Sequence, residues 1–73
     1  MRREFKVKTK MVIPLIKIYK KFGWEVMVIE REDLTTYVRV QLYKGTIRVW
    51  IISTANAREF DKIRVACWGA DND

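Results

Sequence analysis

The stretch YVRVQLYKGTIRVWI, residues 37–51, constrains the fold more than any other part of this chain. Apolar and polar side chains alternate on both sides of Lys44-Gly45, which is the period of a strand with one buried face. Glycine supplies the positive φ that a tight turn needs. We therefore predict an antiparallel hairpin in which Tyr43 pairs with Thr46. One face of the hairpin is aliphatic and carries Val38, Val40, Leu42, Ile47, Val49 and Ile51.

The opposite face of this hairpin is rich in aromatic rings and arginines. It carries Tyr37, Arg39, Gln41, Tyr43, Thr46, Arg48, Trp50 and Ile52. Rings can stack on nucleobases, and guanidinium groups can pair with phosphates or stack on a base themselves. The composition therefore favours contact with nucleic acid. Burial of the same face against a second copy of the chain is the alternative, because apolar sheet faces rarely stay uncovered.

The residues before the hairpin indicate one helix and one or two strands. Residues 4–13 alternate and suit a strand or an extended arm. Pro14 suits the first turn of a helix, so we predict a helix over 14–22 that Gly23 ends. Its apolar stripe is Leu15, Ile18, Tyr19 and Phe22. A start after Thr9 as N-cap is the alternative, and residues 24–31 are β-branched and apolar enough for a strand.

The residues after the hairpin favour a second helix. Ser53 is a good N-cap, and Ala57, Phe60, Ile63 and Cys67 then form an apolar stripe. A shorter helix over 54–61 followed by a strand over 62–68 is the alternative. The predicted class is α+β with the order α-β-β-β-α. A three-stranded antiparallel meander has its helices on one face, a basic N-terminal strand or arm precedes it, and residues 69–73 form a frayed acidic tail.

The positive charge of the chain is concentrated at one end. The 73 residues suit one small domain, with an arm over 1–13 and a core over 14–68, and they carry a net charge of +6. Residues 1–21 hold eight basic side chains against Glu4, a net of +7, and residues 22–73 hold seven basic and eight acidic ones, a net of −1. This asymmetry, with a pI near 9.8, favours a polyanionic partner.

Several catalytic chemistries lack their residues here. The chain has no histidine and one cysteine, Cys67, and it contains no glycine-rich phosphate loop. The order of elements is also similar to the core of restriction-type and Holliday-junction nucleases. Those enzymes need an Asp and an E-x-K on adjacent strands, whereas the hairpin offers Gln41-Leu42-Tyr43-Lys44. Glu30, Glu32 and Asp33 could in principle hold Mg²⁺. We predict a protein that is not an enzyme and needs no cofactor or metal.

Composition also indicates a cellular setting. A single cysteine excludes an internal disulfide, so a reducing cytoplasm is the simpler location. No run of residues is long and apolar enough to span a bilayer. Abundant Ile, Val, Lys, Arg and Glu, with little Gln, are typical of thermophile proteins. We therefore expect a cytoplasmic protein that does not enter a membrane.

One long segment resembles a known family of RNA-binding proteins. VMVIEREDLTTYVRVQLYKGTIRVWIISTANAREFDKI is similar to the β-β-β-α part of the Alu-binding proteins of the signal recognition particle. A small eukaryotic-type large-subunit ribosomal protein shares the α-β-β-β-α order. The likeness covers roughly residues 14–68 and rests on the alternating strands, Ser53, Ala57 and Lys62-Ile63. In the Alu-binding family two subunits join and the open sheet face meets RNA. The resemblance therefore implies Arg39, Lys44 and Arg48 as contacts.

Two further families share parts of the pattern. Double-stranded-RNA-binding domains have the same order of elements, and residues 53–58 resemble the start of their helix without its two leading lysines. The hairpin around Lys44-Gly45 also resembles that of single-stranded-DNA binders of the PC4 type, although their helix follows four strands.

The sequence therefore predicts a small, non-catalytic nucleic-acid-binding protein, with RNA favoured, single-stranded DNA as a further ligand and a homodimer as the assembly. An interaction or homodimerisation module, such as a subunit or inhibitor whose open sheet face docks on a partner protein, is the alternative function. The predicted contact residues are Arg2, Arg3, Lys6, Lys8, Lys10, Lys17, Lys20, Lys21, Tyr37, Arg39, Tyr43, Lys44, Arg48 and Trp50.

Overall fold

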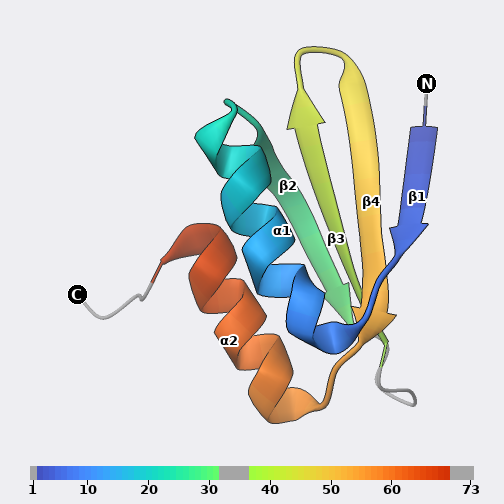
Figure 1. Ribbon diagram of the computed structural model, residues 1–73, viewed down its shortest axis with the longest axis vertical. Coiled ribbons are helices and arrows are strands. Elements are labelled where there is room, and N and C mark those ends of the chain that lie inside the picture. Colours follow the sequence, from blue (N-terminus) through green and yellow to red (C-terminus); the bar gives the residue numbers. More distant parts are fainter. Residues whose placement is uncertain (1, 32–36, 70–73) are drawn as a thin grey trace.

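A computed structural model describes residues 2–31 and 37–69 (Figure 1). Within these residues the order is β1 (Arg2–Lys6), α1 (Thr9–Lys21), β2 (Glu25–Arg31), β3 (Tyr37–Lys44), β4 (Ile47–Thr54) and α2 (Ala57–Trp68). The acidic residues Glu32 and Asp33, and the predicted tail from residue 70 onwards, lie outside the described residues.

One mixed sheet carries both helices on the same face. Its strand order is β1-β4-β3-β2, and β2, β3 and β4 form the antiparallel meander that the sequence predicts. Figure 1 shows α1 and α2 side by side on one face of the sheet, which confirms the α+β class. The predicted number of three strands is wrong, because β1 joins the sheet parallel to β4. The edge of β4 has backbone groups that need partners, and residues 2–6 supply them.

The connection from β1 to α1 is held by β4. The backbone N–H of Val7 donates to the carbonyl of Ile52 at 2.9 Å, and the Ser53 hydroxyl donates to the carbonyl of Val7 at 2.7 Å. The Thr9 hydroxyl donates to the carbonyl of Thr54 at 2.6 Å. The basic N-terminus is therefore tied to the sheet over residues 2–9, so the predicted strand is confirmed for residues 2–6 and the alternative of an arm is wrong.

The central hairpin has the predicted faces with a different register. Tyr43 pairs with Arg48 and Lys44 with Ile47, so the turn residues are Gly45-Thr46, with Gly45 at φ +61°. The predicted pairing of Tyr43 with Thr46 is therefore wrong by two residues. A shift of two leaves each side chain on the same face of a strand, because the side-chain period is two. The aliphatic face is accordingly confirmed, and Val38, Val40 and Leu42 are fully buried.

Helix α1 begins at Thr9 and not at Pro14. The additional turn brings Val12 to the sheet together with Ile16, and both are fully buried. The predicted stripe is therefore wrong for Ile18 and Phe22, which are exposed. Pro14 lies inside the helix, where its ring is tolerated on the solvent side although it lacks an N–H to donate to Lys10.

Helix α2 begins with a capping box. The Asn56 side chain accepts from the backbone N–H of Glu59 at 2.8 Å, and the Glu59 carboxylate accepts from the backbone N–H of Asn56 at 2.9 Å. The predicted N-cap, Ser53, lies in β4 instead. Residues 57–68 are one helix, so the alternative strand over 62–68 is wrong.

The core lies between the sheet and the helices. Its buried members are Val12, Ile16, Val38, Val40, Leu42, Ile51, Ala55, Ile63 and Cys67. The Lys20 ammonium of α1 donates to the carbonyl of Cys67 at 2.6 Å, which places a cation at the carboxyl end of α2. Neither described helix is long and apolar enough to cross a membrane.

Candidate nucleic-acid interface

The open face of the sheet holds the rings and arginines that the sequence singles out, but its central ring is covered. The Arg39 guanidinium carbon lies 4.5 Å from the centroid of the Trp50 ring, and Arg39 Nη1 lies 3.7 Å from Glu30 Oε1. Trp50 is only 8% exposed although neither helix packs on this face. Arg39 therefore covers the ring that a nucleobase would need for stacking.

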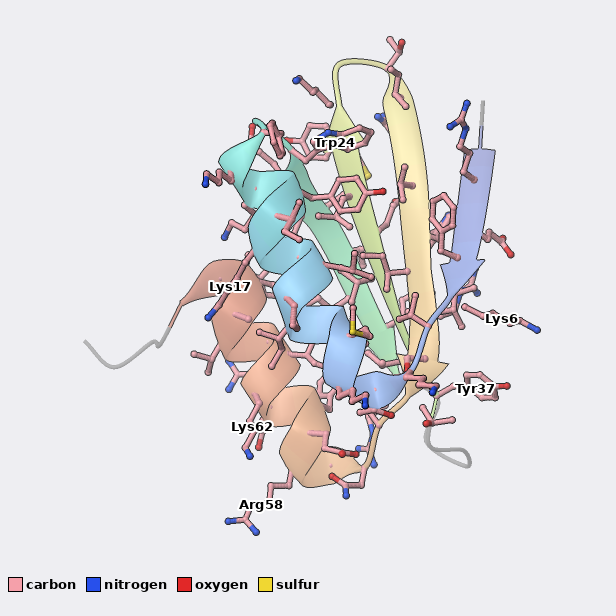
Figure 2. All side chains as sticks on the ribbon, in the orientation of Figure 1. Lys6, Lys17, Trp24, Tyr37, Arg58 and Lys62 are labelled. Atoms are coloured by element: carbon pink, nitrogen blue, oxygen red, sulfur yellow. The ribbon has the colours of Figure 1, made fainter. Side chains whose placement is uncertain are left out.

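Tyr43 has a similar neighbour. The Arg48 guanidinium carbon lies 5.4 Å from the centroid of the Tyr43 ring, and Arg48 Nη1 donates to the carbonyl of Gly45 at 3.2 Å. Tyr37 differs, because it is exposed at the start of β3 and points away from the sheet in Figure 2. Among the predicted stacking residues, Tyr37 is the one whose ring is most exposed.

The open face also carries carboxylates that reduce its charge. Glu4 pairs in register with Trp50, Glu25 with Tyr43 and Glu30 with Arg39, so all three acids share this face. The basic side chains described on the same face are Lys6, Arg39 and Arg48. Three cations against three carboxylates leave the described part of the face with no net charge.

The helical layer carries the charge instead. Residues 8–21 hold five lysines and no acid, and residues 57–68 hold three basic and two acidic side chains. These eight cations are Lys8, Lys10, Lys17, Lys20, Lys21, Arg58, Lys62 and Arg64. The net charge of these two segments is therefore +6, on one side of the molecule.

Three of these lysines border one groove between the helices, which we call the lysine groove. Lys17 and Lys62 line a hollow of about 650 Å³ whose apolar floor is Ile13, Val65 and Ala66. A smaller adjoining hollow of about 300 Å³ is lined by Lys10 and again by Lys62. Figure 2 shows Lys17 on α1 and Lys62 on α2 at the solvent side of the two helices. Cations from two helices thus lie along one depression made of two adjoining hollows, which share Ile13 and Lys62.

The carboxylates near this groove have partners within α2. Glu59 is engaged in the capping box, and Asp61 Oδ1 lies 3.9 Å from Arg64 Nε. Both residues line the depression. Three lysines against two carboxylates leave the lining of the depression with a net charge of +1, and Arg64 adds a further cation beside Asp61.

The remaining predicted contact residues are spread over the molecule. Lys20 is bound to the carbonyl of Cys67, and the Lys44 ammonium donates to the carbonyl of Phe22 at 2.8 Å. Arg3 lies on the helix side of β1, beside Phe5. Lys8 is the N-cap of α1, Lys21 lies in the last turn of α1, and Arg2 is the first residue of β1, described by its backbone alone.

Lys62 and Arg58 were not among the sequence-based predictions. A usable signal was present, because Arg58, Lys62 and Val65 recur at i, i+4 and i+7 on the flank of α2 opposite Ile63 and Cys67. That signal depends on α2 being a helix throughout, which the sequence left open.

The described residues offer no candidate metal centre, and their one cysteine is buried. No group of three His, Cys, Asp or Glu residues that could hold a metal ion occurs within residues 2–31 and 37–69. Burial raises the pKa of the Cys67 thiol from its ordinary value of 9.0 to about 11, although the nearby Lys20 ammonium acts in the opposite direction. Cys67 is therefore a neutral, packed thiol at physiological pH.

The comparisons with known proteins give no functional assignment for this chain. The chain matches no protein-family model, no curated protein and no solved structure.

Proposed function

We propose that this protein binds nucleic acid without catalysing a reaction on it, and that the lysine groove is the main contact. The observation that carries the proposal is the net charge of +6 on residues 8–21 and 57–68, against an open sheet face with no net described charge. Nucleic-acid affinity comes largely from cations that replace condensed counterions at phosphates. A reducing cytoplasm, as inferred from the single cysteine, is the setting that we propose.

The groove suits a phosphate backbone better than a row of bases. Lysine ammonium groups are point charges that bind phosphate without reading sequence, and the floor of Ile13, Val65 and Ala66 offers no aromatic platform. The open sheet face offers rings, but Trp50 and Tyr43 lie under Arg39 and Arg48. We therefore expect sequence-independent binding in which phosphate contacts dominate.

The experiment compares two triple variants with the same change of charge on different faces. The groove variant is Lys10→Gln with Lys17→Gln and Lys62→Gln. The control variant is Lys6→Gln with Arg39→Gln and Arg48→Gln, on the sheet face. Fluorescence anisotropy measures the affinity of each for labelled single- and double-stranded RNA and DNA across a salt series, and the four probes separate RNA from DNA.

We expect the groove variant to lose about tenfold or more in affinity at moderate salt. The slope of log affinity against log salt concentration should decrease by about two to three, because each of the three lost phosphate contacts contributes about 0.7 to 0.9. The control variant should lose less than about threefold, and both should melt cooperatively. The reverse ranking would assign the site to the sheet face. Equal losses of affinity in the two variants, or binding to heparin but to none of the four nucleic acids, would reject a dedicated groove. If the wild type binds none of the nucleic acids at low salt, the proposed nucleic-acid-binding function is rejected.

A further inference from the structure

The two helices leave part of their own face of the sheet uncovered. Figure 1 shows β1 and the adjoining edge of β4 standing clear of both helices. A groove of about 370 Å³ lies there, and we call it the apolar trough. It is lined by Arg3, Phe5, Tyr19, Trp24, Ile47 and Val49. The Tyr19 and Trp24 rings meet edge to face, with centroids 5.1 Å apart, and close one end of it.

Helix α1 borders this trough with exposed apolar side chains. Lys20 contacts α2 and Lys17 lines the groove toward α2, so the flank of α1 that carries Met11, Ile18 and Phe22 is the opposite one. Ile18 is 52% exposed and Phe22 is 65% exposed. In the trough itself Phe5 is 43% and Ile47 is 50% exposed. Exposed apolar side chains on α1 together with an apolar trough are typical of an interaction site.

The dimensions suit one α-helix. Adjacent strands lie about 4.8 Å apart, so β1 and β4 together present a strip that one helix of about 10 Å diameter covers. The exposed positions Met11, Ile18 and Phe22 of α1 recur at i, i+7 and i+11, the spacing of a helix-packing seam. Because α1 has 13 residues, the seam matches a partner helix of about three turns.

The charge at the rim selects the partner. Arg3 lines the trough, Lys44 lies at the carbonyl of Phe22, and Lys21 lies in the last turn of α1, next to Phe22. Helix α1 contains no acid, and Glu4 and Glu25 belong to the other face of the sheet. Two copies of α1 packed seam to seam would place lysines against lysines, which is unfavourable at positions that flank a helix–helix seam.

We propose that the apolar trough binds an acidic amphipathic helix of a partner protein. Its apolar stripe packs between α1 and β1, and its carboxylates meet the ammonium and guanidinium groups at the rim. This site is separate from the lysine groove, because it lies on the other flank of α1.

The test uses synthetic helix-stapled peptides of 14 residues with leucine at the seam positions. One peptide carries glutamate on the flanks, a second carries lysine there, and a third carries glutamate with serine in place of leucine. The protein variant is Ile18→Ser with Phe22→Ser, and the matched control on α2 is Val65→Ser with Trp68→Ser. All four positions are exposed, so we expect both variants to keep the wild-type melting curve. Anisotropy measures peptide affinity, and light scattering measures oligomeric state.

We expect the wild type to be a monomer that prefers the glutamate–leucine peptide over the other two by about tenfold or more. The Ile18/Phe22 variant should lose that binding by a similar factor, while the α2 control keeps it. Nucleic-acid binding should change less than about twofold in the trough variant, which separates this proposal from the lysine groove. Equal binding of the lysine peptide, or unchanged binding by the trough variant, overturns the proposal. A wild-type dimer that the trough variant abolishes would assign the trough to a second copy instead.

Discussion

Arg39 and Trp50 illustrate how single residues decide what the open sheet face can bind. The guanidinium lies over the indole at 4.5 Å and also reaches Glu30, so three side chains from β2, β3 and β4 form one layer. Arg39 Nε is buried without a described hydrogen-bond partner, which is a cost that the stacking and the ion pair offset. A ligand that stacks on Trp50 must first displace Arg39.

Cys67 supports a prediction at the same scale. Its pKa of about 11 leaves roughly a hundredfold less thiolate at pH 8 than a thiol with a pKa of 9.0. We expect native protein to react with a disulfide reagent such as DTNB at least about a hundredfold more slowly than guanidinium-unfolded protein. Rapid native reaction would show that the thiol is neither buried nor neutral.

The raised pKa of the Cys67 thiol also predicts how the free energy of unfolding changes with pH. The folded pKa is above the unfolded value of 9.0, so unfolded protein releases the thiol proton first. The contribution to the free energy of unfolding is therefore intact below pH 9 and decreases as pH rises toward 11. Cys67→Ala serves as the control. Because this variant has no thiol, its free energy of unfolding should lack the decrease that Cys67 contributes between pH 9 and 11.

At the scale of elements, polar contacts at the two ends of α1 join it to the sheet and to α2. Thr9 at the start of α1 donates to the carbonyl of Thr54, which ends β4. Lys20 near the end of α1 donates to the carbonyl of Cys67 near the end of α2. These contacts hold the two helices side by side, so Lys10, Lys17 and Lys62 lie along one groove.

The capping box of α2 can be tested by substitution. Asn56→Ala removes the acceptor for the Glu59 N–H, and we expect the free energy of unfolding to decrease by about 1 kcal/mol. Asn56→Asp keeps an acceptor oxygen and should stay close to the wild type. Urea denaturation followed by circular dichroism measures both, and an unchanged midpoint for Asn56→Ala would contradict the role of the cap.

At the scale of the whole molecule, charge is divided between two layers. The helical segments carry eight cations against two acids, whereas the open sheet face has equal numbers of each among its described side chains. Like charges on the helices repel one another and oppose folding when no polyanion is bound. The concentration of positive charge on the helices therefore has a cost in stability for the free protein.

This repulsion predicts how salt affects folding. Raising sodium chloride from about 20 to about 500 mM shortens the screening length several-fold, so we expect the thermal midpoint to rise by a few degrees. The Lys10/Lys17/Lys62→Gln variant should show a clearly smaller rise than the Lys6/Arg39/Arg48→Gln variant in the same calorimetric series. A midpoint that falls with salt would mean that ion pairs such as Arg39–Glu30 outweigh the repulsion.

The alternation of residue types was enough to predict the faces of the hairpin and the class of the fold. Val38, Val40 and Leu42 alternate with Tyr37, Arg39 and Tyr43, and this local period survives an error of two residues in register. The helical character of 57–68 was also visible as a stripe, although its cap was not. These features depend on neighbours a few residues apart, which a sequence displays directly.

Which of these features come together on a surface depends on contacts between residues far apart in the chain. Strand pairing with Trp50 and Arg39 places Glu4 and Glu30 on the open face. The packing of α1 against α2 places Lys17 and Lys62 at the same hollow, although they are far apart in the chain. The uncovered strip beside β1 likewise exists because residues 2–6 pair with β4 beyond the reach of α1 and α2. Long-range pairing and packing set these juxtapositions, and no local pattern of residue types encodes them.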